Sequence, residues 1–112
     1  VLWGPTRMYA IAFDMDYDAL RRVYPGDPKS AYGDICRVLN RFGFQRQQGS
    51  VYFGGKHSTP VTATLAVQAV GKKHPWFAHA VRDCRLLRVE ENNDLLPALG
   101  ELTLPLGDLE EA

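Results

Sequence analysis

The chain has few cysteines, no excess of charge of either sign and no long apolar run. Its two cysteines, Cys36 and Cys84, fit no Cys-x-x-Cys metal or redox spacing, so we expect buried free thiols in a reducing compartment. No stretch approaches the roughly 18 uninterrupted apolar residues of a membrane span, and we predict no membrane segment. The formal net charge is zero, so an argument for nucleic-acid binding has to rest on local clusters of charge.

What is present is typical of one ordinary globular domain. Of the 112 residues, 46% are apolar and 23% are charged, which is enough apolar material for a single hydrophobic core. Residues 1–7 have neither the apolar region nor the cleavage site of a secretory signal, and we expect a leader or an expression remnant there. We predict a folded domain over residues 8–99 and a C-terminal extension over residues 100–112.

The stretch Met8–Asp14 (MYAIAFD) is predicted to be the central strand of the fold. Tyr9, Ile11 and Phe13 point to one face, and the alternate residues, which are also apolar, point to the other. A strand that is apolar on both faces is usually covered by helices on one side and by a second layer or a partner chain on the other. Asp14 lies where this strand ends.

The rest of the domain alternates between helical and extended patterns. We predict a short helix near residues 16–23 capped by Asp16 or Asp18, a long helix from Pro28 to Gly43, strands over 44–47 and 50–53 joined through Gln48 and Gly49, a helix from Pro60 interrupted at Gly71, a helical turn over 76–81, and a strand over 84–89. In the second long helix, Val61, Leu65 and Ala69 are predicted to form the buried stripe. The leucine-rich tail is expected to dock on the domain or on a partner.

The order strand, helix, strand, strand, helix, strand predicts an α+β, ferredoxin-like fold. Two helices would cover one face of a four-stranded antiparallel sheet. The other face would then be open, although the central strand is apolar on that side too. A homodimer that buries this open face is the simplest solution.

Asp14 is the leading candidate for a catalytic residue. A carboxylate at a strand end can hold Mg²⁺ and activate water against a phosphodiester, and a two-fold axis near the strand ends would bring a second Asp14 into the same cleft. Two carboxylates close together would raise the pKa of one or bind a divalent ion jointly. The alternative is that Asp14 only accepts backbone hydrogen bonds at a turn, and spacing alone favours this alternative. Asp16 could share the metal, but helix capping is its more typical role.

The basic residues are grouped locally although the total charge is zero. Arg82, Arg85 and Arg88 lie along the last predicted strand and Arg46 lies in the hairpin. Guanidinium groups suit phosphate, although the same residues could pair with nearby acids on the surface, which is the interpretation preferred for helix residues Arg37 and Arg41. The three histidines lack the spacing of a metal or general-base set and are interpreted as surface or loop residues: His57, His74 and His79.

Three segments together resemble the virulence-associated protein D family: MYAIAFD in the first strand, FGFQRQQGSVYFGG in the hairpin and AVRDCRLLRVEE near the last strand. The resemblance runs from about Met8 to Leu99. It implies a dimeric, cytoplasmic bacterial endoribonuclease of toxin type, with a ferredoxin-like fold related to the small nuclease-like subunit of CRISPR adaptation systems. It also implies that Asp14 is the catalytic residue, and it leaves room for an antitoxin protein as a second partner.

Further positions match the family's motifs without a defined role. Gln48, Gly49 and Ser50 match the hairpin motif, and Arg82, Asp83 and Arg85 match the last-strand motif. From their polarity we expect the substrate-binding residues to be Arg46, Gln48, Ser50, Arg82 and Arg85, with single-stranded RNA as substrate and Mg²⁺ as the candidate cofactor. Two alternatives stay open: a non-catalytic dimer that binds nucleic acid or protein, and a small-molecule regulatory module at the dimer interface.

Overall fold

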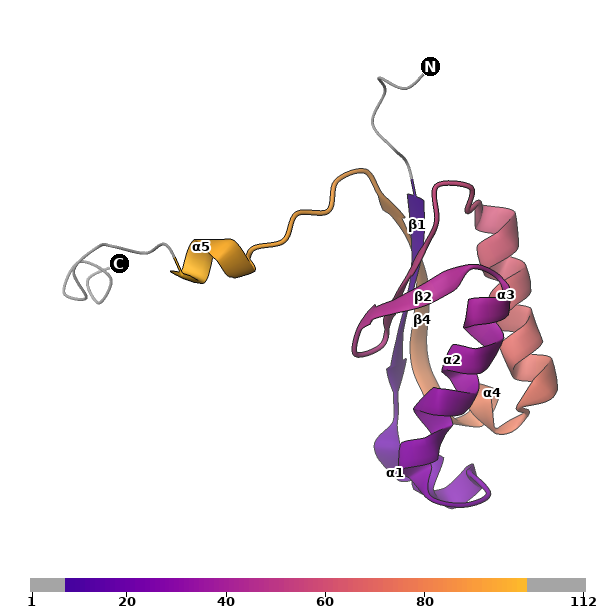
Figure 1. Ribbon diagram of the computed structural model, residues 1–112. Helices are drawn as coiled ribbons and strands as arrows, with labels where there is room; N and C mark the ends of the chain where they lie inside the picture. The colour runs from indigo at the N-terminus through magenta and orange to yellow at the C-terminus, as the bar shows by residue number, and fades with distance from the viewer. Residues whose placement is uncertain (1–7, 101–112) are drawn as a thin grey trace.

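The structure is a computed structural model that describes residues 8–100, so the predicted leader and residues 101–112 of the predicted extension lie outside the described residues. Figure 1 shows its elements in chain order. These are β1 (Met8–Met15), α1 (Tyr17–Val23), a 3₁₀ turn (Pro28–Ser30), α2 (Ala31–Arg41), β2 (Phe44–Gln48), β3 (Val51–Gly54), α3 (Pro60–Lys73), α4 (Trp76–Ala80), β4 (Val81–Val89) and α5 (Leu96–Gly100).

The four strands form one antiparallel sheet in the order β2-β3-β1-β4. Strand β1 is central: Ala10 lies opposite Phe53 of β3 on one side and opposite Leu87 of β4 on the other. The element order and the sheet are those of a ferredoxin-like α+β fold, which confirms the prediction. Both neighbours of β1 run antiparallel to it, so the carboxyl end of β1 lies beside the start of β3 and the start of β4.

The helices begin where the sequence supplies caps. The Asp16 side chain accepts a hydrogen bond of 3.1 Å from the backbone N–H of Ala19 and so caps α1. Thr59 and Thr62 form a reciprocal capping box ahead of α3, with Pro60 at its first turn. These contacts fix where the chain turns from the sheet into the helical layer.

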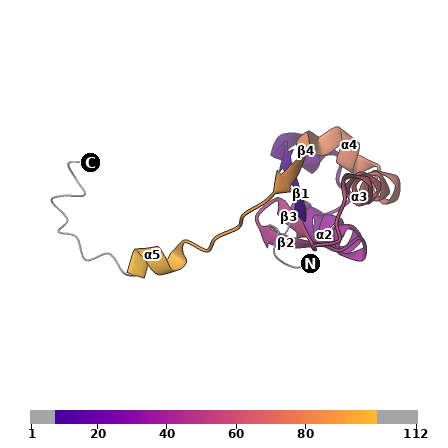
Figure 2. The ribbon, with the colours of Figure 1, turned by 90° about the horizontal axis from the view of Figure 1, so that it is seen from above.

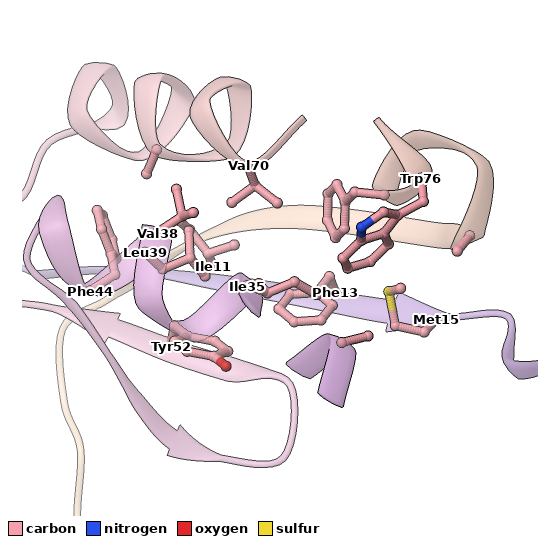
Figure 3. Packing of buried hydrophobic residues seen from close by; sticks show 14 of the residues in the cluster. Ile11, Phe13, Met15, Ile35, Val38, Leu39, Phe44, Tyr52, Val70 and Trp76 are labelled. Carbon is pink, nitrogen blue, oxygen red and sulfur yellow. The ribbon is translucent and has the colours of Figure 1, made fainter. Parts of the chain in front are cut away.

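The core lies between the sheet and the helical layer, as Figure 3 shows. Phe13 of β1 stacks on Tyr52 of β3, with ring centroids 5.8 Å apart, and meets Phe77 edge to face at 5.9 Å. Ile35 and Leu39 of α2 are almost completely buried in the same cluster. The face of β1 that carries Ile11 and Phe13 is therefore the one that packs against the helices.

Three predicted details of the second half are wrong. Helix α3 presents Val61 and Leu65 to the outside, with 66% and 48% of their surface exposed, and instead buries Ala63, Ala66 and Val70. Small alanines let α3 approach its neighbours closely, and the apolar residues around this helix do not by themselves indicate which face is buried. Helix α3 also continues through Gly71 to Lys73, since a single glycine costs a helix only about 1 kcal/mol. Strand β4 begins at Val81, three residues before its predicted start.

No helix among residues 8–100 covers the other face of the sheet. In Figure 2, helices α2, α3 and α4 lie on one side of the strands, and the chain beyond β4 leaves on the opposite side. The radius of gyration is 17.9 Å, against about 12 Å for a compact chain of this length, because α5 projects away from the domain. Residues 95–100, the described part of the leucine-rich tail, therefore project away from their own domain. Among residues 8–100, no helix is long and apolar enough to span a membrane.

Candidate active site

Asp14 lies near the carboxyl end of β1 with its side chain on the open face of the sheet, 62% exposed. The backbone around it is tied on both sides. The N–H of Phe13 donates to the carbonyl of Ser50 at 3.1 Å, and the N–H of Asp16 donates to the carbonyl of Ala80 at 2.8 Å. Over the described residues, the Asp14 side chain accepts no hydrogen bond, and the capping of the following helix is done by Asp16. The Asp14 carboxylate is thus held in place by its backbone and remains accessible.

Asp83 of β4 lies directly across from Asp14 in the strand register. Residues in direct register share a face of the sheet, and like charges in this relation repel each other. Asp83 is itself paired with Arg85, whose Nε donates to both carboxylate oxygens at 3.0 and 3.2 Å. This hydrogen bond and the Asp83 charge raise the pKa of the Arg85 guanidinium. A single chain therefore presents two carboxylates side by side at the end of the sheet.

Arg82 lies between Asp14, near the end of β1, and Asp16, which follows the strand. Its Nη1 is 3.9 Å from Oδ2 of Asp14, and its Nη2 is 4.0 Å from Oδ1 of Asp16. The register shifts between Asp14 and Met15, so that Arg82 has no partner in the ladder, as in a β-bulge. The hydrogen bond from the backbone N–H of Ala19 lowers the pKa of the Asp16 carboxyl, and the positive charge of Arg82 lowers it further. Desolvation raises this pKa, but by less than the Ala19 hydrogen bond lowers it. The bulge therefore brings a guanidinium to the acidic end of β1.

The hairpin contributes less to this cluster than predicted. Ser50 lies at the same end of the sheet, with its backbone carbonyl bonded to β1. Arg46 and Gln48 belong to β2, which is separated from β1 by β3. Arg46 pairs in register with Tyr52, whose side chain lies in the core. The Nε of Arg46 donates a hydrogen bond of 2.9 Å to the carbonyl of Gly49. Within one chain Arg82 lies near Asp14, and Arg85 is bonded to Asp83, the register partner of Asp14. The two β2 residues are not part of this cluster.

Asp83 is the site residue to which sequence reasoning assigned no role. The sequence shows it as a member of the last-strand motif without a defined role, and its proximity to Asp14 follows from the β1–β4 register. The pairing preferred for the helix arginines is found for Arg37 with Asp34. The alternative left open for the arginines of the last strand, pairing with nearby acids, is found for Arg85 with Asp83 and for Arg88 with Glu90.

The donor set fits a magnesium ion that shares its ligands with a substrate. Within the described part of the chain, no three His, Cys, Asp or Glu side chains form a group that could hold a metal. Mg²⁺ sites in phosphoryl chemistry commonly use one or two carboxylates together with water and substrate phosphate oxygens. Asp14 and Asp83 are the two carboxylates that could hold such an ion, and Arg82 and Arg85 are the cations that could face a phosphate.

Comparison with known proteins gives one consistent group of relatives. The chain is 48% identical over 96 residues to Endoribonuclease VapD 2 of Riemerella anatipestifer, a match that covers 82% of this chain and 99% of that protein. It is 45% identical over 92 residues to an Endoribonuclease VapD homolog of Helicobacter pylori, covering 82% and 96% of the two chains. It is 37% identical over 87 residues to Endoribonuclease VapD of Dichelobacter nodosus, covering 78% and 91%. No family model matches the chain.

Proposed function

Because the chain belongs to the VapD family of endoribonucleases, we propose that it cleaves single-stranded RNA with Asp14 as the catalytic carboxylate. The observation that carries the proposal is the pairing of Asp14 with Asp83 on an exposed sheet end beside Arg82 and Arg85. An acid that activates a nucleophile and cations that hold the phosphate are the groups that phosphodiester cleavage requires.

Each residue of the cluster has a distinct task in this proposal. Asp14 accepts a proton from water or from the ribose 2′-hydroxyl. Asp83 holds Arg85 through its Nε, which leaves the terminal nitrogens of that guanidinium to donate to a phosphate oxygen. Arg82 offsets the two negative charges at the end of β1. When bound, Mg²⁺ would be held by Asp14 and Asp83 and would neutralise charge on the phosphate.

We further propose that the active form is a homodimer that buries the open face of the sheet. Leu87 of β4 is 42% exposed, and it lies in register with Ala10 and, through it, with Phe53. These residues form an apolar strip that no helix covers. A second copy on this face would cover the strip and bring a second Asp14 to the same region. An antitoxin partner stays a prediction from the family resemblance.

The decisive test is RNA cleavage by the Asp14→Asn variant. We expect cleavage of a fluorogenic single-stranded RNA to fall by about 10²-fold or more, the usual loss when a general base is removed. Asp18→Asn is the matched control, because Asp18 is another exposed acid, 72% exposed, and pairs only with Arg21 in α1. Circular dichroism should show both variants folded, and addition of a chelator would test for a metal.

Equal cleavage by the Asp14→Asn variant and the parent would refute the role of Asp14. Saturable RNA binding without products from the parent protein would instead support the non-catalytic binding dimer. In that case binding should weaken steeply with salt, because phosphate contacts release counterions.

A further inference from the structure

A groove on the helical side of the sheet has no cover. Strand β4 is an edge strand, and its residues Cys84 and Leu86 lie in register with Phe13 and Ile11, so they face the helical layer. Helix α3 does not extend over them, and Leu86 remains 44% exposed. The resulting groove between α3 and β4 has a volume of about 260 Å³ and includes Val67 in its lining. This is below the range of about 300–1,000 Å³ usual for small-molecule sites, and it suits a few apolar side chains.

The C-terminal arm, residues 90–100, carries apolar side chains without a partner. Leu95, Leu96 and Leu99 are 74%, 71% and 70% exposed. Leu96 and Leu99 are three residues apart in the single helical turn α5, and Leu95 directly precedes it. The turn begins where the Asp94 carboxylate accepts a hydrogen bond of 2.9 Å from the N–H of Leu96. An exposed leucine cluster of this kind marks an interaction site.

The course of the arm leads away from the groove of its own chain. Residues Asn92 to Leu96 line a cavity together with Gln47, Gln48, Val51 and Phe53 of the hairpin. The arm therefore leaves the end of β4 beside the hairpin on the open-face side, and Figure 2 shows it continuing outward on the side opposite to α3. This is the side on which a second copy would lie.

The arm is long enough to reach the groove of such a second copy. Face-to-face sheets lie about 10 Å apart, and the groove is a few ångströms beyond the partner's sheet. Residues 90–95 in extended conformation span about 20 Å. The leucines at the end of this segment can therefore reach the edge of the partner's helical layer.

The charge of the chain is also divided in a way that favours this contact. Residues 8–89 contain twelve lysines and arginines against six aspartates, whereas residues 90–112 contain seven acids and no basic residue. Beside the groove, Arg88 lies in register with Tyr9 and so faces the same side as Leu86. A zero net charge thus conceals a basic domain and an acidic tail, which attract each other.

We propose that the C-terminal arm of each chain docks its leucine face in the α3–β4 groove of a second copy of the chain. This inference rests on the homodimer of the proposed function and names the second contact that holds it. Leu95, Leu96 and Leu99 cover Cys84 and Leu86 of the partner, while the arm's acids lie near the partner's arginines.

Both cysteines are free, but the prediction that they are buried is wrong, because Cys84 is exposed and Cys36 is only partly buried. The exposed Cys84 allows the contact to be trapped as a disulfide. One species carries Cys36→Ser and keeps Cys84. The other carries Cys36→Ser, Cys84→Ser and Leu96→Cys with an enlarged tag. The two full-length species are mixed with a mild oxidant at about pH 9, because burial and the Asp83 charge raise the pKa of the Cys84 thiol. We expect a mixed disulfide of intermediate size on a non-reducing gel.

Val61→Cys replaces Leu96→Cys in the control species, since Val61 is 66% exposed on the outer side of α3. The mixed product should form at least about tenfold faster with Leu96→Cys than with the control, because docking raises the effective concentration of the two thiols. Equal rates would overturn the proposal. A single chain that carries both Cys84 and Leu96→Cys and closes on itself would overturn it too, because the arm would then dock on its own domain.

Sedimentation separates this proposal from the homodimer itself. Leu95→Ser, Leu96→Ser and Leu99→Ser together should weaken dimerisation by at least tenfold, whereas Leu87→Glu should disrupt the open-face contact. A dimer that responds to Leu87→Glu and not to the arm substitutions would refute the arm contact and leave the dimer standing. A parent protein that is monomeric at all concentrations would refute both, whatever its activity on RNA.

Discussion

Replacing Tyr52 by phenylalanine should stabilise the protein. Tyr52 has no exposed surface, and its hydroxyl is the one fully buried side-chain oxygen or nitrogen without a hydrogen-bond partner in the described part of the chain. A buried unpaired polar group costs about 1–3 kcal/mol. The loss of the oxygen leaves a small void that costs about 0.3 kcal/mol, so the free energy of unfolding should rise by about 1–2 kcal/mol.

The same substitution should change the response to alkaline pH. Burial raises the pKa of Tyr52 to about 12, from 10.0 for a free tyrosine. The unfolded chain therefore loses this proton first, and the parent should lose stability between about pH 10 and pH 12, by on the order of 2 kcal/mol from this residue. The Tyr52→Phe variant lacks this loss and should show a flatter alkaline limb.

Urea unfolding at neutral pH and at about pH 11 measures both effects. In thermal unfolding at neutral pH, the melting temperature should rise by roughly 4–8 °C for each kcal/mol by which the free energy of unfolding increases. A variant that is less stable than the parent at neutral pH would show that the hydroxyl makes a favourable contact, for which the neighbouring Cys36 sulfur is the candidate. In that case the destabilisation caused by Tyr52→Phe should disappear in a protein that already carries Cys36→Ala.

Two further substitutions test the packing and the helix cap. Gly54→Ala would place its Cβ 2.5 Å from Cβ of Ser58 and 2.7 Å from Cε1 of Phe44, so it should cost about 1–3 kcal/mol in urea unfolding, whereas Gly55→Ala meets no atom within 4 Å and serves as the control. Equal stability of the two variants would contradict this. Asp16→Ala should lower the melting temperature at pH 7, and the gap should close as pH falls below about 3.8, because the folded state lowers the pKa of Asp16. A gap independent of pH would contradict the cap.

The sequence allows the central part of the fold to be predicted because its signals are local. Two apolar faces mark β1 as a central strand, and Asp27 with Pro28 marks the start of the helical segment that becomes α2. The buried face of α3 is not a local property, since Val61 and Leu65 are as apolar as the residues that are actually buried. The approach of neighbouring elements decides between them.

In the candidate site, too, some features follow from local sequence signals and others depend on how the strands pair. Asp14 stands out in the sequence because it ends an apolar strand, and Arg82 and Arg85 stand out as cations near the last strand. The closeness of Asp83 to Asp14 depends on the pairing of two strands that are far apart in sequence. The bulge that brings Arg82 to Asp14 depends on the same register. A shift of one residue would move these side chains to the opposite face.

The backbone hydrogen bonds around Asp14 have a consequence for the evolution of proteins with this fold. Its backbone is fastened through Phe13 and Asp16 to neighbouring segments, while its carboxylate contributes no hydrogen bond to the described structure. Folding therefore places little selection on the side chain at this position. A lineage could exchange the acid for a neutral residue and inherit the architecture unchanged. Under the proposed catalytic role of Asp14, the residue at this position should distinguish active nucleases from inactive relatives more reliably than overall sequence identity does.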